Sequence, residues 1–321
     1  MSLLVLSDAD VRALLDMESC ITAMEDVLAA LARGELTMPL RFVVRPPAEQ
    51  LLGLMPAHRG GAAPLFSLKE VVIAPGNGAR GLDPHQGAVL LHDGETGVLE
   101  AVANASAITE IRTAAVSAVA TKLLARPGAR RVAILGAGVQ ARSHAVAMRT
   151  VVEDPELRIW SRTPAHAEAL ALESHAVACD TVEDALDGAE IVCTCTSSRE
   201  PIVRSAWIAP GTHLNAVGSS IPTARELDAD LIAEAALFVD RRESTVNESG
   251  DYLGAVEEAG IGPDHIRAEL GELLVGSAGG RRDDDEVTVF KSLGLAVEDL
   301  AAAALCAERA RERGVGAEVE F

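Results

Sequence analysis

The chain has 321 residues, of which 49% are apolar, so it is long enough to bury a sizeable core or to form two domains. Its 48 acidic and 28 basic side chains give a formal charge of −20, which repels phosphate backbones, and its 2% of aromatic residues leave few surfaces for base stacking. We therefore expect no nucleic-acid partner, and no membrane either, because no stretch approaches the roughly 18 uncharged apolar residues of a membrane span.

The N-terminus and the cysteines indicate a compartment. MSLLVLSDADVRALL has no basic region before an apolar core, so we expect a cytoplasmic protein. The cysteines are scattered, as reduced thiols usually are: Cys20, Cys179, Cys193, Cys195 and Cys306. Cys193 and Cys195 would share one face of a strand, where they are better explained as small buried side chains than as metal ligands. No histidine pair has metal-ligand spacing, and we predict no metal.

The first part of the chain predicts an α+β unit. After Ser7, the stretch LLDMESCITAMEDVLAALARGEL predicts an amphipathic helix that ends at Gly34. From Arg41 to Ala103 the pattern changes to short apolar runs separated by PP, GG, PGNG and DGETG. Such runs and turns are typical of an antiparallel sheet with tight connections.

From about Thr113 the pattern changes again, to strands that alternate with helices. An alanine-rich helix precedes the apolar runs VAILG, LRIWS, EIVCTC, HLNAVG and LFVD. This alternation indicates right-handed βαβ crossovers and a parallel sheet with helices on both faces. The predicted fold class is therefore α/β, with a Rossmann-type doubly wound sheet. Residues 293–314 predict a long amphipathic helix that can return to the first unit.

The turn RVAILGAGVQA is the first candidate binding site. Gly136 would make a tight turn after a strand and Gly138 would start the next helix, so that the backbone N–H groups there, near Val139 and Gln140, approach a pyrophosphate. The third position of the G-x-G-x-x-G/A fingerprint is Ala141. A purely structural turn is the alternative, but the position between a predicted strand and a predicted helix favours dinucleotide binding.

The end of the following strand bears on the choice of cofactor. NAD enzymes usually place a carboxylate there for the ribose 2′-hydroxyl, whereas a 2′-phosphate needs cations or hydroxyls. The sequence RIWSRT supplies Ser161, Arg162 and Thr163 and no carboxylate. We predict NADPH, with NADH possible but less favoured; the alternative is that Arg162 is simply a surface residue.

With these motifs in view, the chain resembles the ornithine cyclodeaminase/mu-crystallin family along nearly its whole length. The matching stretches are LGLMPA (52–57), SLKEV (67–71), PGN with GLDPHQG (75–87), EIRTAAVSA (110–118), ILGAGVQA (134–141), HLNAVGSSIPTARELD (213–228) and VTVFKSLGLAVEDL (287–300). The resemblance implies a homodimer. It also implies a substrate-binding and dimerisation domain, 1–113 with 296–321, beside a Rossmann dinucleotide-binding domain, 114–295.

The resemblance also implies site residues. Lys69 and Arg112 match contacts to a substrate carboxylate, Arg41 matches a further cation, and Met55 and His85 are expected to line the same pocket. A bidentate guanidinium with an ammonium beside it orients a planar carboxylate well. Without the resemblance, Lys69 would be expected on an exposed strand and Arg112 at a helix surface. The further cofactor-binding residues expected are Thr113, Thr196, Asn215, Val217, Gly218, Ser292 and Gly294.

Two departures from the family pattern bear on the reaction. Cyclodeaminases of this family carry an aspartate base where this chain has Ser220, and an acidic residue for the distal amine where it has Gly53. A hydroxyl cannot replace a carboxylate base without a partner. Asp228 is near in sequence but does not align with the missing aspartate, and a surface helix position is its simpler interpretation.

The pattern is instead similar to that of mu-crystallin-like ketimine reductases, which reduce a cyclic C=N bond that bears a carboxylate. We therefore expect an NADPH-dependent reductase of imino acids such as pyrroline-2-carboxylate or piperideine-2-carboxylate. Lys69, Ser220 or a water would manage the nitrogen proton, with His85 as another candidate acid. Two alternatives stay open: a cyclodeaminase or alanine-type dehydrogenase on the same scaffold, and a protein that binds NADPH and a small ligand without turnover.

Overall fold

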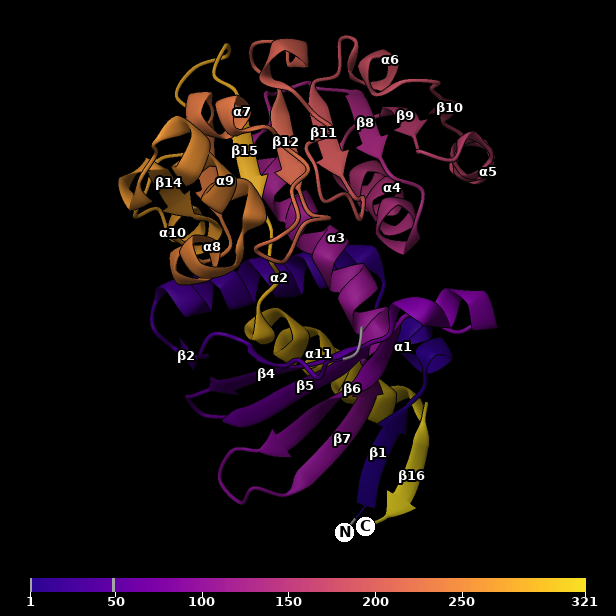
Figure 1. Cartoon of the computed structure of the whole chain (residues 1–321). Helices are drawn as coiled ribbons and strands as arrows, with labels where there is room; N and C mark the ends of the chain where they lie inside the picture. Colours follow the sequence, from indigo (N-terminus) through magenta and orange to yellow (C-terminus); the bar gives the residue numbers. More distant parts are fainter. Residues whose placement is uncertain (1, 48–49) are drawn as a thin grey trace. The chain divides into compact units, whose positions relative to one another are not determined.

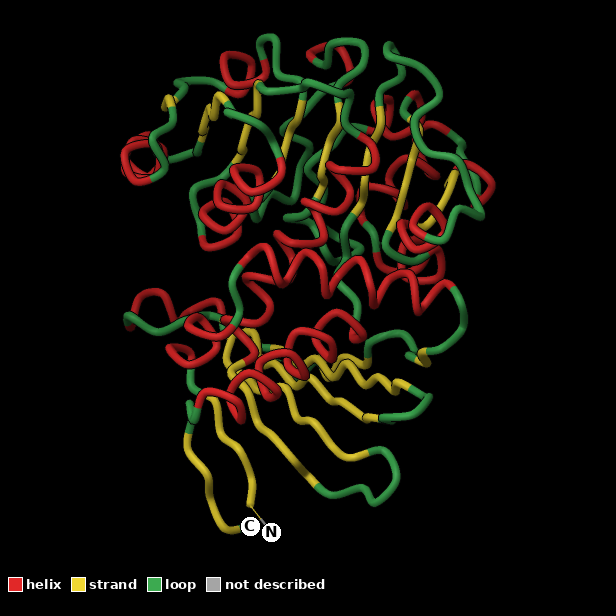
Figure 2. The backbone as a smooth tube through the Cα atoms, turned by 180° about the vertical axis from the view of Figure 1, so that it is seen from behind, coloured by secondary structure: helices red, strands yellow, loops and turns green. Residues whose placement is uncertain are grey.

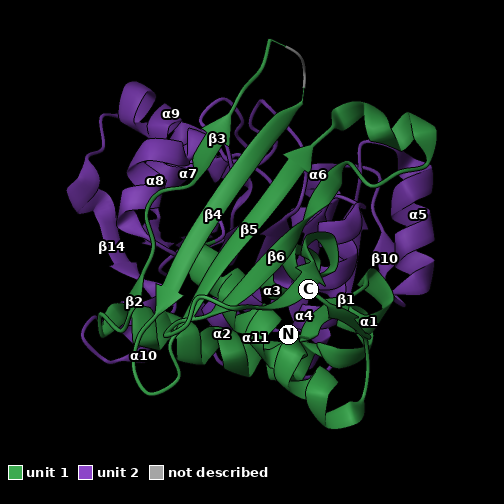
Figure 3. Cartoon of the chain, turned by 90° about the horizontal axis from the view of Figure 1, so that it is seen from below, with its two compact units in different colours: residues 1–112, 295–321 green, residues 113–294 purple. Residues whose placement is uncertain are grey.

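The computed structural model describes residues 2–47 and 50–321, which form two compact units. Unit 1 consists of Met1–Arg112 with Leu295–Phe321, and unit 2 consists of Thr113–Gly294 (Figure 3). Each boundary lies one residue before the position expected from the sequence. The first boundary falls inside the helix of residues 105–124, which is therefore shared by both units. The second boundary falls just before the helix of residues 296–313, which belongs to unit 1.

Unit 1 is built on a mixed sheet with the strand order β16-β1-β7-β6-β5-β4-β2, and β3 pairs with β4. Its strands are β1 (Ser2–Leu6), β2 (Leu36–Thr37), β3 (Phe42–Val44), β4 (Leu51–Arg59), β5 (Leu65–Ile73), β6 (His85–Asp93), β7 (Leu99–Asn104) and β16 (Ala317–Glu320). Its helical segments are α1 (Asp8–Leu14), α2 (Met17–Ala32), a 3₁₀ turn (Pro75–Arg80), the first part of α3 (Ala105–Leu124) and α11 (Ala296–Arg313).

The single helix expected after Ser7 is two helices. Ser7 caps α1 by accepting from the backbone N–H of Asp10, and Asp16 caps α2 by accepting from the N–H of Ser19. Aspartate is a strong N-cap because its side chain satisfies an orphan donor of the first turn. The first helix therefore ends at Leu14, and a new helix begins after Asp16. The apolar stripe along α2 is the one that the sequence predicts.

The sheet of unit 1 is antiparallel from β7 to β2, as expected, but its other edge was not foreseen. Strand β1 runs parallel to β7, and β16 pairs antiparallel with β1, with Ser2 opposite Glu320. The two ends of the chain thus share one edge of one sheet, and Figure 2 shows their strands side by side.

One face of this sheet is covered and the other is open. Helix α11 packs on β4, β5 and β6 and against α2. On the strands, residues alternate between the two faces, so Met55 and Lys69 are buried under the helices while their neighbours are more exposed. The open face carries large apolar side chains: Phe42, Val44, Phe66 and Val72 are all exposed. In Figure 3 this face of β4 and β5 is turned to the viewer.

Unit 2 is a doubly wound sheet, which confirms the predicted fold class. All its strand pairs are parallel, in the order β10-β9-β8-β11-β12-β15-β13-β14. The strands are β8 (Arg131–Leu135), β9 (Glu156–Trp160), β10 (Val177–Ala178), β11 (Ile191–Thr194), β12 (His213–Ala216), β13 (Ala236–Val239), β14 (Ile266–Glu269) and β15 (Thr288–Lys291). Chain order reverses between β8 and β11, which is where dinucleotide-binding sheets have their crevice.

Helices cover both faces of the second sheet (Figure 1). They are the rest of α3, then α4 (Val139–Val151), α5 (Pro164–Glu173), α6 (Val182–Leu186), α7 (Ala229–Glu234), α8 (Arg242–Glu248), α9 (Gly250–Ala259) and α10 (Leu270–Leu274), with 3₁₀ turns at Ser205–Trp207 and Pro263–His265. In residues 2–47 and 50–321, no helix has the length and hydropathy of a membrane span.

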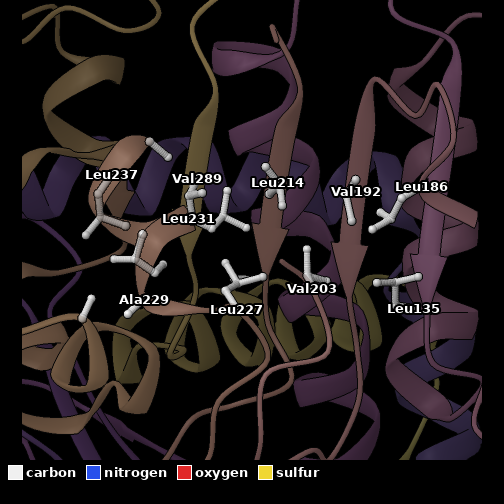
Figure 4. Packing of buried hydrophobic residues seen from close by; sticks show 14 of the residues in the cluster. Leu135, Leu186, Val192, Val203, Leu214, Leu227, Ala229, Leu231, Leu237 and Val289 are labelled. Atoms are coloured by element: carbon white, nitrogen blue, oxygen red, sulfur yellow. The ribbon is translucent and has the colours of Figure 1, made fainter. Parts of the chain in front are cut away.

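A continuous apolar cluster holds the second sheet to its helices. Leu135, Val192, Leu214 and Val289 come from four neighbouring strands and pack against α6, α7 and α9 (Figure 4). Because strands of a parallel sheet are buried on both faces, they read as near-continuous apolar runs rather than as an alternating pattern. This rigid sheet sets the positions of the turns that follow its strands.

Candidate active site

The glycine turn of unit 2 begins where β8 ends. Gly136 has a φ of 124°, which L side chains rarely adopt, and its N–H donates to the carbonyl oxygen of Trp160 at 2.7 Å. A Cβ at Gly136 would lie 2.5 Å from the carbonyl oxygen of Cys195. The turn is therefore pressed against the loop after β11, and only glycine fits it.

Helix α4 follows this turn with its first amide groups uncapped by a side chain. Gly138 is the N-cap residue and supplies no side-chain acceptor, and a Cβ placed on it would meet nothing within 4 Å. An N-terminus of this kind, beside a glycine turn at the reversal of strand order, suits a pyrophosphate. The residues present thus fit a dinucleotide, with the amides near Val139 and Gln140 as its phosphate donors.

The turn after β9 carries polar groups without a carboxylate. Ser161 Oγ accepts from the backbone N–H of Thr163 at 3.4 Å, and Arg162 is exposed. The carbonyl of Trp160, the last residue of β9, is the acceptor of the Gly136 N–H, so the two turns are adjacent. This is the position where an NAD enzyme usually places its acidic residue.

The other residues expected to bind the cofactor fall into two groups. Thr196, Val217, Gly218, Ser292 and Gly294 all follow β11, β12 or β15, at the carboxyl edge of the sheet. The side chain of Asn215, in contrast, is fully buried and donates to Thr121 Oγ1 at 3.0 Å on α3. Thr113, at the start of unit 2, is also buried within α3. For these two residues, cofactor binding stays a prediction that their own burial does not favour.

Unit 1 contains a buried cluster of four charges. Lys69 lies on the covered face of β5, opposite Met55 in the register, and its Nζ is 2.7 Å from Asp299 Oδ2 and 3.3 Å from Thr109 Oγ1. Arg112, on α3, donates from Nη1 to Glu298 Oε2 at 2.7 Å and from Nε to Asp299 Oδ1 at 3.0 Å. We call Lys69, Arg112, Glu298 and Asp299 the charge cluster. None of its side chains is more than 4% exposed.

Opposite charges counteract the effect of burial on Lys69 and Asp299. Burial lowers the pKa of Lys69 to about 8, against the pull of Asp299, and the charges of Arg112 and Arg41 lower it further. Burial would raise the pKa of Asp299, but the charges of Arg112 and Lys69 keep that pKa below its ordinary value. Both carboxylates lie in the first turn of α11, where the helix N-terminus also favours negative charge.

Two further residues expected in the substrate pocket interact electrostatically with this cluster. Arg41 is partly buried and contributes to the lowered pKa of Lys69. His85 begins β6 with 53% of its side chain exposed, and partial removal from water together with the charge of Lys69 lowers its pKa, against Asp83. Arg41 and His85 thus both interact electrostatically with Lys69.

Sequence reasoning missed Glu298 and Asp299. The signal was the pair of adjacent acids in LGLAVEDLAAAAL, at the start of a helix that is otherwise apolar. Ser220, a candidate for the nitrogen proton, follows β12 in unit 2. Asp228, for which a surface helix position was the simpler interpretation, is the N-cap of α7 and accepts from the N–H groups of Leu231 and Ser205. Among the described residues, no group of three or more histidine, cysteine or acidic side chains has the arrangement of a metal site.

Comparison with known families decides among the possible relationships. Residues 1–314 match the model of the ornithine cyclodeaminase/mu-crystallin family. The chain belongs to that family. The match includes both units and both candidate sites, so the resemblance seen in the sequence motifs is confirmed.

Relatives within the family are similar over most of the chain. Ketimine reductase mu-crystallin of Mus musculus is 42% identical over 292 residues, which is 89% of this chain and 90% of the relative. Delta(1)-pyrroline-2-carboxylate reductase of Thermococcus litoralis, solved in complex with NADH and L-proline, is 35% identical with a TM-score of 0.93, over 98% of this chain and 100% of that one. An archaeal alanine dehydrogenase dimer with bound NAD is 31% identical with a TM-score of 0.94, over 100% of both chains.

The charge cluster predicts a large and specific stability effect. Replacing Asp299→Asn leaves Lys69 and Arg112 buried with one anion between them, so we expect the free energy of unfolding to fall by about 3–5 kcal/mol. Urea denaturation monitored by circular dichroism measures it. The matched control is Asp8→Asn, in the first turn of α1 and paired on the surface with Arg12 at 2.8 Å, which should cost less than about 1 kcal/mol. Equal losses would show that the cluster is not electrostatically special.

Proposed function

We propose that this protein is an NADPH-dependent reductase of small cyclic imino acids, of the pyrroline-2-carboxylate or piperideine-2-carboxylate type. As a member of the family it is an NAD(P)H-dependent oxidoreductase that acts on carbon–nitrogen bonds. The observation that carries the proposal is the buried pair Lys69 and Arg112, in a chain that has no acid at positions 53 and 220.

The substrate carboxylate would be held by the cations of unit 1. Arg41, whose charge lowers the pKa of Lys69, adds positive potential near the same two cations. Glu298 and Asp299 fix Arg112 and Lys69 in place before the substrate arrives, which lowers the ordering cost of binding. Held in this way, the carboxylate fixes the neighbouring imine carbon.

The proton on nitrogen can come from the same residues. With a pKa of about 8, Lys69 carries a proton at neutral pH and is buried away from bulk water. The neutral imine nitrogen next to the carboxylate therefore meets a donor that water does not compete with, and it becomes the iminium when it accepts the proton of the Lys69 ammonium. When bound, the nicotinamide supplies the hydride. The glycine turn, α4 and Ser161–Thr163 would hold the dinucleotide, as their fit to its phosphates indicates.

The rival reactions place demands that this chain does not meet at the aligned positions. Cyclisation of a diamino acid needs a base near the substrate amine and an acid for the distal amine, and the aligned residues are Ser220 and Gly53. An alanine-type dehydrogenase on this scaffold is the second candidate, favoured by the archaeal relative that is 31% identical over 100% of the chain.

One assay separates these functions. The protein is incubated with NADPH plus pyrroline-2-carboxylate or piperideine-2-carboxylate, and separately with NADP⁺ or NAD⁺ plus ornithine, lysine or alanine, while absorbance at the nicotinamide band is followed. We expect rapid oxidation of NADPH with a cyclic imine. Faster turnover of alanine would identify a dehydrogenase, conversion of ornithine to proline would identify a cyclodeaminase, and no turnover with measurable NADPH binding would identify a binding protein.

The carboxylate clamp predicts a specific kinetic loss. Arg112→Lys keeps a positive charge beside Glu298 and Asp299 but loses the two-pronged donor, so kcat/KM for the imine should fall by roughly 10- to 100-fold. The dissociation constant of NADPH should barely change. The control Arg12→Ala removes an arginine paired with Glu110 at 2.6 Å on the surface of unit 1 and should leave kcat/KM unchanged. Unchanged kinetics in Arg112→Lys would remove the clamp from the mechanism.

Ser220 carries a separate prediction. Because the imine can arrive protonated and Lys69 can donate, Ser220→Ala should keep a substantial part of the imine reduction. Ser220→Asp should introduce weak amine oxidation, because it restores the carboxylate found in the cyclodeaminases. Steady-state rates in both directions test this, and complete loss of reduction in Ser220→Ala would make the hydroxyl the proton donor.

Lys69 also predicts how ligand binding depends on pH. Below pH 8 its ammonium is present and attracts a carboxylate, and above pH 8 this charge is lost, so affinity should fall by up to about tenfold per pH unit. Pyrrole-2-carboxylate suits the measurement by calorimetry, since it does not titrate between pH 6 and 10. In Lys69→Arg the side chain stays charged and the affinity should not change over this range. A decline that persists in the variant would point to another group.

The turn after β9 predicts the choice between NADPH and NADH. We expect a higher kcat/KM with NADPH, because Ser161–Thr163 offer hydroxyls and a guanidinium to a 2′-phosphate and no carboxylate to a 2′-hydroxyl. Ser161→Asp should reverse the preference by repelling the phosphate. The structures of relatives with bound NAD or NADH make equal kcat/KM the competing outcome, and that result would contradict the prediction.

The open face of the first sheet predicts a homodimer. Phe42, Val44, Phe66 and Val72 are between 40% and 64% exposed, a concentration of large apolar side chains that usually marks an interface. Light scattering at micromolar concentration should give twice the 33.4 kDa of the chain. Phe66→Glu should shift the protein toward monomer, whereas Leu172→Glu, an equally drastic change at an exposed site on α5, should not. A monomeric wild type would refute the prediction.

A further inference from the structure

Unit 2 contains a fully buried carboxylate that none of the steps above uses. Glu226, in the loop before α7, has no exposed surface. Its Oε1 accepts from the N–H and the hydroxyl of Thr196, at 2.7 and 2.8 Å, and its Oε2 accepts from the hydroxyl of Thr194 and the N–H of Gly218, both at 2.7 Å. A carboxylate with four donors and no exposed surface is a structural centre of the loops that supply them.

The donors favour the ionised form of Glu226. Burial raises the pKa of this carboxyl, against the charge of Lys291 and the hydrogen bond from Thr194. Each oxygen, however, accepts one backbone N–H, and backbone N–H groups can only donate. The hydroxyl of Thr196 accepts from the N–H of Ser198, so its own hydrogen is directed to Glu226.

Two further buried charges complete this network. Asp251, at the start of α9, accepts from the N–H groups of Glu226 and Leu227 and from the hydroxyl of Ser219, and its Oδ2 lies 2.9 Å from the ammonium of Lys291 at the end of β15. Burial would raise the pKa of Asp251, but Lys291 keeps it below the ordinary value. Two carboxylates and one ammonium leave the group with a net negative charge inside the protein.

The network ties together the loops that follow three neighbouring strands. Thr194 ends β11, Gly218 follows β12 and Lys291 ends β15, whereas the glycine turn follows β8. A Cβ at Gly218 would lie 2.1 Å from the carbonyl oxygen of Thr196 and 2.5 Å from Glu226 Oε1, so the two loops and the carboxylate are in tight contact. In a doubly wound sheet the fingerprint turn serves the first mononucleotide, and the strands beyond the reversal serve the second.

These loops direct their donors inward. The N–H groups of Thr196 and Gly218 point at Glu226, and that of Val217 donates to the carbonyl of Thr194 at 3.1 Å. They are therefore engaged by the protein and are not a cradle for an anion, unlike the start of α4. A site backed by buried negative charge, with its amides turned away, suits a group that carries positive charge.

We propose that Glu226, supported by Asp251, is a positioning residue that makes the bound cofactor favour its oxidised, positively charged nicotinamide over the neutral reduced ring. The proposal rests on the dinucleotide binding in the proposed function. For a reductase the effect is useful, because hydride donation breaks a C–H bond of the neutral ring and leaves a cation there, while the new C–H bond forms on the imine carbon. Negative charge behind the ring lowers the energy of that product state.

Binding affinities for the two redox forms test this without turnover. Dissociation constants of NADP⁺ and NADPH are measured by calorimetry for the wild type and for Glu226→Gln. Removing one buried charge should weaken NADP⁺ relative to NADPH by roughly five- to tenfold, because a buried unit charge acts strongly through the low effective dielectric constant of the protein. Lys291→Met makes the network more negative and should shift the ratio in the opposite direction.

Glu190→Gln is the matched control. Glu190 is a partly buried carboxylate of the same unit that accepts two backbone N–H groups, from Arg130 and Arg131, but at the amino ends of β8 and β11. It should leave the ratio unchanged. An unchanged ratio in folded Glu226→Gln, or in folded Lys291→Met if the first variant does not fold, overturns the proposal. If neither form binds the wild type, the proposed cofactor use fails instead, so the two failures are distinguishable.

Discussion

The ion pairs between Lys69, Arg112 and the two carboxylates at the start of α11 are the interaction on which unit 1 depends. Four charges are buried there, and each would be costly without its partners. The cations come from β5 and α3, whereas the anions come from a helix far along the chain, where Asp299 lies 187 residues after Arg112. The C-terminal segment therefore does more than cover the sheet, because it supplies the counter-charges that let two cations lie in the interior.

Both units bury charged side chains and pair them with side chains of opposite charge. In unit 1, Lys69 and Arg112 are paired with Asp299 and Glu298. In unit 2, the carboxylates of Glu226 and Asp251 outnumber the ammonium of Lys291 behind the loops of the second mononucleotide half. In both places the charged side chains are held in position by their partners. A ligand that binds there would therefore require little movement of these side chains.

The features that the sequence predicted are set by short stretches of the chain. The features that it missed depend mainly on contacts between distant residues. The glycine turn, the alternation of strands and helices and the turns of the first sheet all follow from short patterns, and the structure contains them. The break at Asp16 was missed because the apolar stripe continues across it, and β16 was missed because AEVE is short and polar. Lys69 was correctly expected near Arg112 only through the family resemblance. Its burial follows from Asp299, whose partner cannot be read from spacing.

The pairing of β1 with β16 affects the order in which the two units can fold while the chain is being synthesised. Unit 2 is complete once residue 294 has left the ribosome, whereas unit 1 still lacks α11 and the edge strand. Until then the chain lacks the two carboxylates of α11 that pair with Lys69 and Arg112. It also lacks the helix that covers one face of the first sheet. Domains generally form as the chain emerges, so the nucleotide-binding half should fold first and the N-terminal half last. A nascent chain from which residue 294 has emerged, but not α11, would therefore hold a folded unit 2 after an unfolded N-terminal segment.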